Sequence, residues 1–549
     1  MKKNSILLLT ILLFLNVSYS NAQLKFILED FEGLAEGQSN LKKEGLFTYG
    51  SARAQIDNML TTGYGYSGAR SLKIEWKKGE LYGGWGKGIG LNMELNAQQD
   101  FLNFYMYSPK SNKRSDKLKI TLEEDDNNNA IFEKDQDDSW SYIMKKECKD
   151  EWQLVSIPLS DFKDSNKGGD GKFNISYKEG KLLTFIISFL DTNYINDHQA
   201  WYFDFICFSK GKLPMGADKF EPPVSSKNDT CILGAWSEEG NDGNFLAIPK
   251  TFESLFNTGS ISKKIELVHF FKPFAAGGPK APNLYFNAPK INELFDKGYT
   301  PMITIEDHYV KVEKKQRQPN LYSIVEGHFD YLFIEWAKRM KEVKGPVLLR
   351  ILHEFNGDWY PWSIAKNDNN AKLFIQAYQH IWTIFNSQNV TNVKFIWCPN
   401  SMSSPQQAWN FIMDAYPGDK YVDYVGLDVY NGAGDNGIPI WRSFRKEAIE
   451  NYFLLTENFP TKPLIICETS SRERKTGEQG VLQNKAEWIG QMSEALKTDL
   501  SKITAVTWFN QYDQFKVNSS PEAQKSYLDN FWLDPFYHKK EMKSTIGTK

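Results

Sequence analysis

PVLLRILHEFNGDWYPW, residues 346–362, is an apolar, β-rich run that ends in a charged and aromatic loop. A second run, KPLIICETSS (462–471), ends in a similar way, and its Glu468 lies 114 positions after Glu354 of the first. In a parallel β/α barrel the carboxyl ends of all strands face one shared mouth. The two runs therefore predict two carboxylates at one mouth, provided that the rest of the chain builds such a barrel.

Eight strand-like runs follow residue 230, with helical stretches between them. The runs are CILGAW (231–236), IELVHFFKPF (265–274), TPMITIEDHY (300–309), PVLLRILHEF (346–355), NVKFIWCPN (392–400), VDYVGLDVYN (422–431), KPLIICETSS (462–471) and ITAVTWFNQ (503–511). Stretches such as AKLFIQAYQHIWTIFNS (371–387) carry apolar residues at the three- and four-residue spacing of an amphipathic helix. Eight such units in roughly 300 residues predict a closed (β/α)8 TIM barrel. An open doubly wound sheet is the alternative, but its usual Gly-rich phosphate loop after the first strand is missing.

Before residue 210 the pattern is different. Short β-type runs such as SLKIEW (71–76) and WYFDFICF (201–208) alternate with Gly- and Asn-rich turn clusters, which predicts an all-β sandwich. The stretch between the two patterns is rich in Lys, Pro, Ser and Gly, as linkers are. We expect a signal peptide at 1–22, a β-sandwich module at 23–210, a linker at 211–230 and a barrel at 231–540.

Residues 1–22 have the features of a cleaved secretory signal. Lys2 and Lys3 precede the apolar run Ile6–Val17, and small residues stand before Gln23. Because no cysteine follows the predicted cut, we expect no lipid anchor at that site, and the run is short for a bilayer span. The chain is expected to be secreted or periplasmic, without membrane insertion, and monomeric.

Charge and cysteine content limit the other possibilities. Loss of Lys2 and Lys3 would take the formal net charge from −3 to −5, a mild balance that argues against nucleic acid or anionic membranes as partners. Of the five cysteines, Cys398 and Cys467 lie in apolar strand-like runs and are expected to be buried free thiols. Cys207 and Cys231 can bridge across the linker or stay free, which the sequence leaves open.

Five of the eight strand-like runs end in polar or aromatic residues that a core would not select. The endings are Glu306-Asp307-His308-Tyr309, His353-Glu354-Phe355-Asn356, Asp428-Val429-Tyr430-Asn431, Glu468-Thr469-Ser470 and Trp508-Phe509-Asn510-Gln511. Endings of this kind on five strands indicate a site at the mouth. Two carboxylates at one mouth are the minimal equipment for hydrolysing a glycosidic bond. Neither an HxH or HExxH metal spacing nor a G-x-S-x-G elbow occurs, which argues against metal and serine hydrolases.

The residues from Cys231 to about Tyr537 resemble glycoside hydrolase family 26, a family of retaining (β/α)8 glycosidases. The resemblance is carried by RILHEFNGDWYPW (350–362), with His-Glu at the end of the fourth strand, and by the glutamate of PLIICETSS (463–471) on the seventh. It implies that Glu354 is the acid/base and Glu468 the nucleophile, with no cofactor for catalysis. In a retaining mechanism the two carboxyl groups lie about 5–5.5 Å apart, and their surroundings must differ so that one is protonated and the other ionised.

Further residues at the strand ends are candidates for contacts with the sugar, His353 by analogy with the family. The candidate substrate-binding residues are His353, Tyr430, Trp508, Trp359, Trp362, His308, Arg350 and Trp236. Arg350 and Tyr430 are also expected to hold Glu468 ionised by charge and hydrogen bond. Trp508 is expected to form the stacking floor of the −1 subsite, the sugar position just before the cut bond, with a core tryptophan as the alternative.

The alternatives for the remaining candidates are structural. His353 either bonds the sugar or props Glu354, and one of Trp359 and Trp362 can be packing rather than part of a subsite. His308, together with Asp307, either contacts a more distant sugar or is structural.

The first 210 residues resemble carbohydrate-binding modules of family 11. Asp30, Glu32 and Asp204 are expected to hold a structural Ca²⁺ between the first and last strands, because hard cations prefer carboxylate oxygens; exposed turn acids are the alternative. Trp85, with Tyr82 and Trp140, is either part of a glycan platform or part of the sandwich core.

Together these observations predict a secreted retaining endo-β-glycanase acting on a β-linked polysaccharide. The family resemblance favours an endo-β-1,4-mannanase. The loop NGDWYPW (356–362) has fewer aromatic residues than mannanases of the family often carry, and the N-terminal module resembles modules that bind mixed-linkage β-glucan. A β-1,3-1,4-glucanase is therefore the second interpretation and a β-1,3-xylanase the third. A glycan-binding protein without activity is the alternative outside enzymes, but it would have no need of both glutamates.

Overall fold

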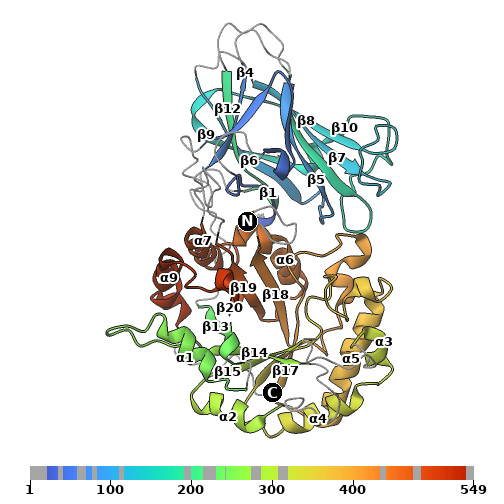
Figure 1. Cartoon of the computed structure of the whole chain (residues 1–549). Coiled ribbons are helices and arrows are strands. Elements are labelled where there is room, and N and C mark those ends of the chain that lie inside the picture. The colour runs from blue at the N-terminus through green and yellow to red at the C-terminus, as the bar shows by residue number, and fades with distance from the viewer. Residues whose placement is uncertain are drawn as a thin grey trace, which may run out of the picture.

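The computed structural model describes residues 22–34, 41–57, 70–76, 83–110, 116–190, 199–213, 230–240, 243–273, 286–306, 319–432, 441–473 and 484–538. The described residues form a β-sandwich stacked on a β/α barrel (Figure 1). None of the described helices combines the length and the hydropathy that a bilayer crossing requires.

The sandwich consists of two antiparallel six-stranded sheets. The first contains β3 (Arg53–Asp57), β4 (Ser71–Trp76), β12 (Gln199–Lys210), β6 (Asp100–Ser108) and β9 (Lys149–Pro158) in that order, with β1 (Gln23–Glu29) paired to β12. The second has the order β10 (Lys163–Asp164), β8 (Ser139–Lys146), β7 (Asp116–Asp125), β11 (Lys181–Phe189), β5 (Gly83–Leu91) and β2 (Leu46–Gly50). Alternating apolar side chains of both sheets meet in one core, as the sequence pattern predicts.

The second part is a closed barrel of eight parallel strands. In barrel order these are β13 (Ile232–Ser237), β14 (Leu267–Pro273), β15 (Thr300–Glu306), β16 (Val347–Arg350), β17 (Val393–Trp397), β18 (Tyr424–Asn431), β19 (Leu464–Ser471) and β20 (Ile503–Asn510). The described helices of this part are α1 (Ala247–Ser254), α2 (Ala288–Asp296), α3 (Leu321–Val325), α4 (Asp330–Met340), α5 (Ala371–Ser387), α6 (Phe444–Asn458), α7 (Lys485–Lys497), α8 (Tyr512–Phe515) and α9 (Pro521–Tyr527). All eight strand-like runs of the sequence are therefore strands of one barrel, and the open-sheet alternative is excluded.

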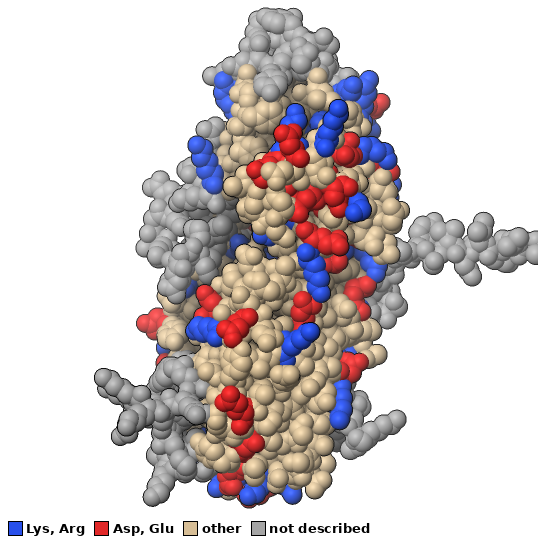
Figure 2. Space-filling model, turned by 90° about the vertical axis from the view of Figure 1, so that its right-hand side faces the viewer, with Lys and Arg blue, Asp and Glu red and all other residues tan. Residues whose placement is uncertain are grey.

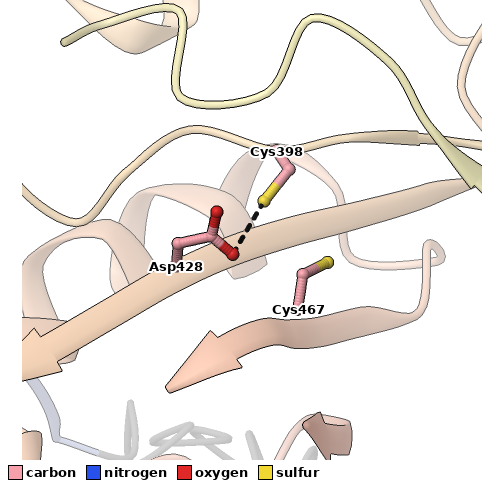
Figure 3. Close-up of side chains that lie close together, drawn as sticks. All are labelled: Cys398, Asp428 and Cys467. Carbon is pink, nitrogen blue, oxygen red and sulfur yellow. Dashed lines mark hydrogen bonds between the residues drawn. The ribbon is translucent and has the colours of Figure 1, made fainter. Parts of the chain in front are cut away.

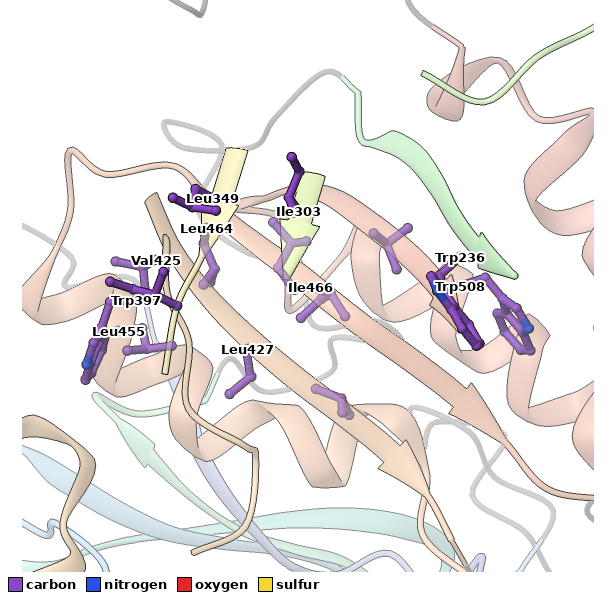
Figure 4. Packing of buried hydrophobic residues seen from close by; sticks show 14 of the residues in the cluster. Trp236, Ile303, Leu349, Trp397, Val425, Leu427, Leu455, Leu464, Ile466 and Trp508 are labelled. Carbon is purple, nitrogen blue, oxygen red and sulfur yellow. The ribbon is translucent and has the colours of Figure 1, made fainter. Parts of the chain in front are cut away.

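Each barrel strand presents alternate residues to the barrel interior and to the surrounding helices. The interior is filled at its amino end by residues such as Leu267, Leu348 and Ala505. The outward residues form the larger core between barrel and helices, part of which is drawn in Figure 4 with Leu427 and Ile466. The mouth at the carboxyl ends of the strands is where alternation brings polar side chains together.

The fourth barrel strand is shorter than the sequence predicts. β16 ends at Arg350, although the apolar run continues to Phe355. Leu352 and Glu354 have φ values of +48° and +51°, in the left-handed region, which a strand cannot accommodate. The chain therefore turns sharply just where the predicted functional motif begins.

The two parts of the chain are in direct contact. Strand β1 of the sandwich packs against α6 of the barrel, and Lys446 of α6 lies 3.3 Å from Glu29. In the loop between β10 and β11, Tyr177 stacks on Phe411 with a ring separation of 4.0 Å and donates its hydroxyl to Glu450 of α6. The sandwich is thus docked on the barrel beside the loops that follow β17 and β18.

Charges of both signs are mixed on the surface. On the face in Figure 2, acidic and basic side chains alternate, and acidic ones gather over the part of the sandwich nearest the barrel. All five cysteines are free thiols, so Cys207 and Cys231 do not form a bridge, and Cys398 and Cys467 are buried as expected.

Candidate active site

Glu468 is directed into the barrel mouth by a bulge in β19. Leu427 and Asp428 are consecutive in β18 but pair with Ile466 and Glu468, so Cys467 is the extra residue. A bulge breaks the strict alternation of a strand and re-aims the side chains around it. Consequently Cys467 and Glu468, although adjacent, both reach the barrel interior.

The Glu468 carboxylate is held by one charged and one neutral donor. Arg350 donates from Nη2 to Oε1, and the Tyr430 hydroxyl donates to Oε2 at 2.7 Å. Burial keeps the pKa of Tyr430 well above its ordinary value, so its hydroxyl stays protonated and can donate. The guanidinium charge beside the carboxylate favours the ionised form of Glu468.

Glu354 is held differently. Its backbone N–H donates to the carbonyl of Cys398 at 2.8 Å, which fixes the left-handed turn after β16. Its Oε1 accepts from the Asn400 amide and its Oε2 from the Trp359 indole, both at 2.7 Å. Within the described residues both donors to this carboxyl group are neutral. The two glutamates thus meet the requirement that their surroundings differ.

Arg350 connects Glu468 to the other buried polar groups of the barrel interior. It is fully buried and donates from Nη1 to both oxygens of Asp428 at 2.5 and 2.6 Å, and from Nε to Thr304 Oγ1 at 2.8 Å. Burial opposes its charge, but the Asp428 carboxylate outweighs this effect and the pKa of Arg350 rises. Being buried, Arg350 cannot touch a sugar, which corrects its assignment as a substrate-binding residue. Its role is to position Glu468.

A neutral histidine completes this hydrogen-bond chain. Burial and the charge of Arg350 lower the pKa of His269 well below its ordinary value. Its Nε2 lies 2.7 Å from Thr304 Oγ1, the oxygen that already accepts from Arg350. The described chain of hydrogen bonds thus runs from His269 through Thr304 and Arg350 to Glu468.

The thiol of Cys398 lies against the same guanidinium, and the thiol of Cys467 lies nearby. Atoms of Cys398, Cys467 and Asp428 lie within 4.8 Å of one another, and Cys398 donates to Asp428 at 3.4 Å (Figure 3). Such a group has the atoms of a soft-metal site. However, Arg350 Nη1 contacts both Asp428 and the sulfur of Cys398, at 3.6 Å. A bound cation would meet this buried positive charge, so we interpret the thiols as packing around Arg350.

The aromatic floor of the mouth is made by Phe509 rather than Trp508. Phe509 faces the interior, where it stacks on Trp236 at 4.5 Å and meets Phe271 and Tyr430 edge-on at 6.2 and 5.7 Å. Trp508 points outward: it is 1% exposed and packs against Trp488 of α7. The assignment of Trp508 to the −1 subsite is therefore wrong, because the neighbouring residue of the strand, Phe509, is the one that faces the mouth.

The other aromatic candidates are also mostly inaccessible. Trp236 is 3% exposed behind Phe509, so it supports the floor instead of forming it. Trp362 is fully buried and donates its indole N–H to the His353 carbonyl at 2.8 Å, so it is packing. Trp359, by contrast, is 42% exposed and bonds Glu354, so it lies where a substrate would pass.

His353 is buried and lies behind Tyr360, whose hydroxyl is 3.0 Å from its Nε2. It supports the half-buried Tyr360, and the direct sugar contact assigned to it is not available in this arrangement. His308, with Asp307, lies outside the described residues.

In the sandwich, Asp30, Glu32 and Asp204 are buried near one another, and the charges of Asp204 and Asp30 help burial to raise the pKa of Glu32. Asp30 also accepts from Ser443 of the barrel at 3.2 Å, so it is part of the docking interface. A Ca²⁺ at this trio stays a prediction. Trp85 and Trp140 are buried in the sandwich core and cannot form a glycan platform, and Tyr82 lies outside the described residues.

Sequence reasoning missed Asn400 and Phe509. Asn400 ends the fifth strand-like run, NVKFIWCPN, and this polar ending is the same signal that marked the other strands. Phe509 is adjacent to Trp508 and belongs to the same strand ending, so only the direction of its side chain was missing. Thr304 stands in the middle of an apolar run, and its role has no sequence signal. The role depends on a contact with Arg350 of the neighbouring strand.

Comparisons with known proteins agree with this geometry. Residues 251–462 match the sequence model of glycosyl hydrolase family 26, and residues 29–201 match that of carbohydrate binding domain 30. The second match corrects the expected resemblance of the sandwich to carbohydrate-binding family 11.

Several relatives share these segments. Endoglucanase H of Acetivibrio thermocellus is 31% identical over 314 residues, 56% of this chain and 31% of that protein. A mannan endo-1,4-β-mannosidase of Bacillus subtilis is 31% identical over 147 residues, 25% of this chain and 37% of that protein. This chain thus spans about a third of the length of these curated relatives.

Among solved structures, the Podospora anserina GH26-CBM35 β-(1,4)-mannanase superposes with a TM-score of 0.42 at 12% identity, covering 90% of this chain and 98% of that one. Over residues 251–462 the barrel is thus similar to glycosyl hydrolase family 26, and over residues 29–201 the sandwich is similar to carbohydrate binding domain 30.

Proposed function

We propose that the chain is a retaining endo-β-glycanase in which Glu354 is the acid/base and Glu468 the nucleophile. The observation that carries the proposal is the contrast between their partners. Glu468 is bonded by the guanidinium of Arg350, whereas Glu354 is bonded only by the neutral amide of Asn400 and the indole of Trp359 within the described residues. Retaining catalysis needs one ionised and one protonated carboxyl group at the same pH.

In the first step Glu468 attacks the anomeric carbon while Glu354 gives its proton to the leaving glycosidic oxygen. The bond to the leaving sugar breaks and an ester bond to Glu468 forms. In the second step Glu354 takes a proton from water, the water oxygen attacks the anomeric carbon, and Glu468 leaves as a carboxylate. Arg350 and Tyr430 keep the Glu468 carboxylate oriented, and Phe509 offers a flat apolar surface for the sugar.

The leading substrate is a β-1,4-mannan. It is supported by the family 26 match and by relatives named mannan endo-1,4-β-mannosidase in several bacteria and fungi. A specific observation favours a second candidate, a β-glucan with mixed 1,3-1,4 linkages. The relative that matches the longest stretch of this chain among those compared above is named an endoglucanase.

The sandwich is proposed to bind the same polysaccharide, because its sequence matches a carbohydrate binding domain. The module boundaries, the cleavage of residues 1–22, export to the periplasm or medium and the monomeric state are proposed with it. Intact mass, N-terminal sequencing and sedimentation of the exported protein test these statements. A Ca²⁺ ion at Asp30, Glu32 and Asp204 is proposed only as a structural ion, with no part in catalysis.

The test is product release by the purified protein from galactomannan, barley mixed-linkage glucan and β-1,3-xylan. Glu468→Gln serves as the inactive control, and Glu473→Gln, five residues further along, as the matched control. Manno-oligosaccharides from wild type and Glu473→Gln but not from Glu468→Gln would support the leading proposal. Gluco-oligosaccharides would select the second candidate. Equal hydrolysis by Glu468→Gln would overturn the nucleophile assignment, and glycan binding without any hydrolysis would leave only a binding protein.

A further inference from the structure

Three carboxylates gather in the sandwich beneath the loop that joins β10 to β11. Single oxygens of Glu124, Asp126 and Asp138 lie within 4.8 Å of one another. Glu124 and Asp138 are fully buried, and Asp126 is half-buried. Within the described residues no lysine or arginine forms an ion pair with any of the three. Buried like charges this close repel strongly unless protons or a cation neutralise them.

Several oxygens of this group lack a hydrogen-bond partner. Asp138 Oδ1, Asp126 Oδ1 and Asn174 Oδ1 are buried and accept no hydrogen bond from the described residues. The neighbouring Asp125 and Asp137 are different, because both oxygens of each accept from backbone N–H groups of the turn. Asp125 and Asp137 therefore build the loop, whereas Asp126 and Asp138 each keep one buried oxygen without a donor among the described residues. Buried oxygens without donors are what a bound cation would satisfy.

Two glycines close the group from either side. A Cβ on Gly169, whose φ is +71°, would lie 2.1 Å from Asp138 Oδ1 and 2.7 Å from Asp126 Oδ2. A Cβ on Gly180 would lie 2.8 Å from Glu124 Oε1 and 3.3 Å from Asn174 Oδ1. The backbone thus passes close to the oxygens at both positions. At Gly169 the positive φ and the short distances both favour glycine.

We propose that Glu124, Asp126, Asp138 and Asn174 bind a calcium ion that fixes the loop from Gly168 to Gly180. The donors are all oxygen, which selects a hard cation, and Ca²⁺ accepts the irregular arrangement that a loop provides better than Mg²⁺ does. This site is separate from the trio at Asp30.

The same loop carries the sandwich's contact with the barrel. Asn174 donates its backbone N–H to Glu124 Oε1 at 3.0 Å. Three residues later Tyr177 stacks on Phe411, and Lys178 lies 3.1 Å from Asp414 of the barrel. The ion would therefore hold Tyr177 in its docking position, coupling calcium binding to the attachment of the two domains.

Terbium, a luminescent substitute for calcium, gives the first test. Trp140 donates its indole N–H to Glu124 Oε2 at 2.8 Å, so light absorbed by this ring should sensitise a terbium ion at the site. The full chain should show sensitised emission that calcium abolishes by competition. Asp138→Asn should weaken terbium binding about tenfold or more, whereas the exposed Asp135→Asn should not. Trp140→Phe should lose the emission and keep the calcium affinity measured by calorimetry.

Unfolding provides the second test, which also covers a variant that folds poorly. In chelator, Asp138→Asn should be at least as stable as wild type, because it removes a repelling charge. In calcium, wild type and Asp135→Asn should unfold at a higher temperature than in chelator, while Asp138→Asn should not respond. Equal terbium affinity for Asp138→Asn and wild type, or an equal calcium response of both, would overturn the proposal. Competition by Mg²⁺ as strong as by Ca²⁺ would overturn the choice of ion.

Discussion

The two glutamates at the mouth are distinguished by a single charge. Arg350 donates to Glu468, whereas Glu354 has only Asn400 and Trp359 as partners within the described residues. Glu354, the proposed acid/base, also has a left-handed backbone conformation, which costs a non-glycine residue roughly 1–2 kcal/mol. Strain of this kind persists only where surrounding contacts enforce it, as the bonds of Glu354 to Cys398, Asn400 and Trp359 do here.

The activity lost on removal of Glu354, the proposed acid/base, should be restored by an added nucleophile. We expect Glu354→Ala to lose about 10²–10⁴-fold in kcat on the polysaccharide, because the leaving oxygen is no longer protonated. On an aryl glycoside with an acidic phenol, the first step needs no acid, and azide can replace water without a general base. Azide should therefore restore turnover and yield a β-glycosyl azide. The exposed Asp358→Ala, in the same loop, should show neither loss nor rescue.

The buried chain behind Glu468 should matter without touching substrate. Thr304→Val keeps the side-chain shape but removes the oxygen that accepts from Arg350 and is hydrogen-bonded to His269. Leaving a buried charged donor unpaired costs about 1–3 kcal/mol, which corresponds to roughly 10- to 100-fold. We expect this loss in kcat with KM little changed, measured by steady-state kinetics, and Thr304→Ser should restore most of it. A change in KM alone would contradict a positioning role.

At the scale of elements, alternation along β20 decides which aromatic ring meets the sugar. Phe509→Ala should raise KM and lower kcat with little change in the free energy of unfolding, because the ring is half-buried at the mouth. Trp508→Ala should instead cost about 3–5 kcal/mol of stability, since it empties a packed layer against α7. Denaturant titration and kinetics of both variants separate the two roles. The reverse pattern would restore Trp508 as the subsite floor.

The comparison of β20, β16 and β19 shows how far sequence reasoning reached. Hydrophobic runs located all eight barrel strands, because burial and strand length are local properties of sequence. The face on which Trp508 lies was misassigned, because a shift of one residue exchanges the two faces of a strand. The early end of β16 and the bulge at Glu468 depend on contacts with neighbouring strands, such as that of Glu354 with Cys398. Such contacts leave no local signal.

At the scale of the whole molecule, the sandwich and the barrel should unfold together. Tyr177 joins them through its stacking on Phe411 and its bond to Glu450. We expect Tyr177→Ala to separate thermal unfolding into two transitions, because it removes both contacts. Tyr177→Phe keeps the ring and should retain most of the coupling. A single unchanged transition for Tyr177→Ala, followed by calorimetry, would show that the contact between β1 and α6 is sufficient.

Docking should also weaken as pH rises. Burial raises the pKa of Glu450 from its ordinary 4.5 to about 7 in the folded chain. A raised carboxyl pKa means that the folded state binds the proton more tightly, so the stability it contributes is complete below pH 4.5 and is lost as pH rises to about 7. Glu450→Gln cannot ionise, so its unfolding temperature should depend less on pH over this interval than that of wild type. The measurement is the unfolding temperature of both proteins as a function of pH.

Because the sandwich is fastened to the barrel by α6, β1 and Tyr177, tether length does not set its distance from the mouth. For a module on a free tether, the effective concentration at a second site falls as the tether grows. Here the effective concentration is fixed by the docking contacts. Extra glycine and serine residues inserted within 214–229 should therefore leave the avidity for an insoluble polysaccharide unchanged. The same insertion combined with Tyr177→Ala should reduce the avidity, because without docking the longer tether lowers the effective concentration of the sandwich at the polysaccharide.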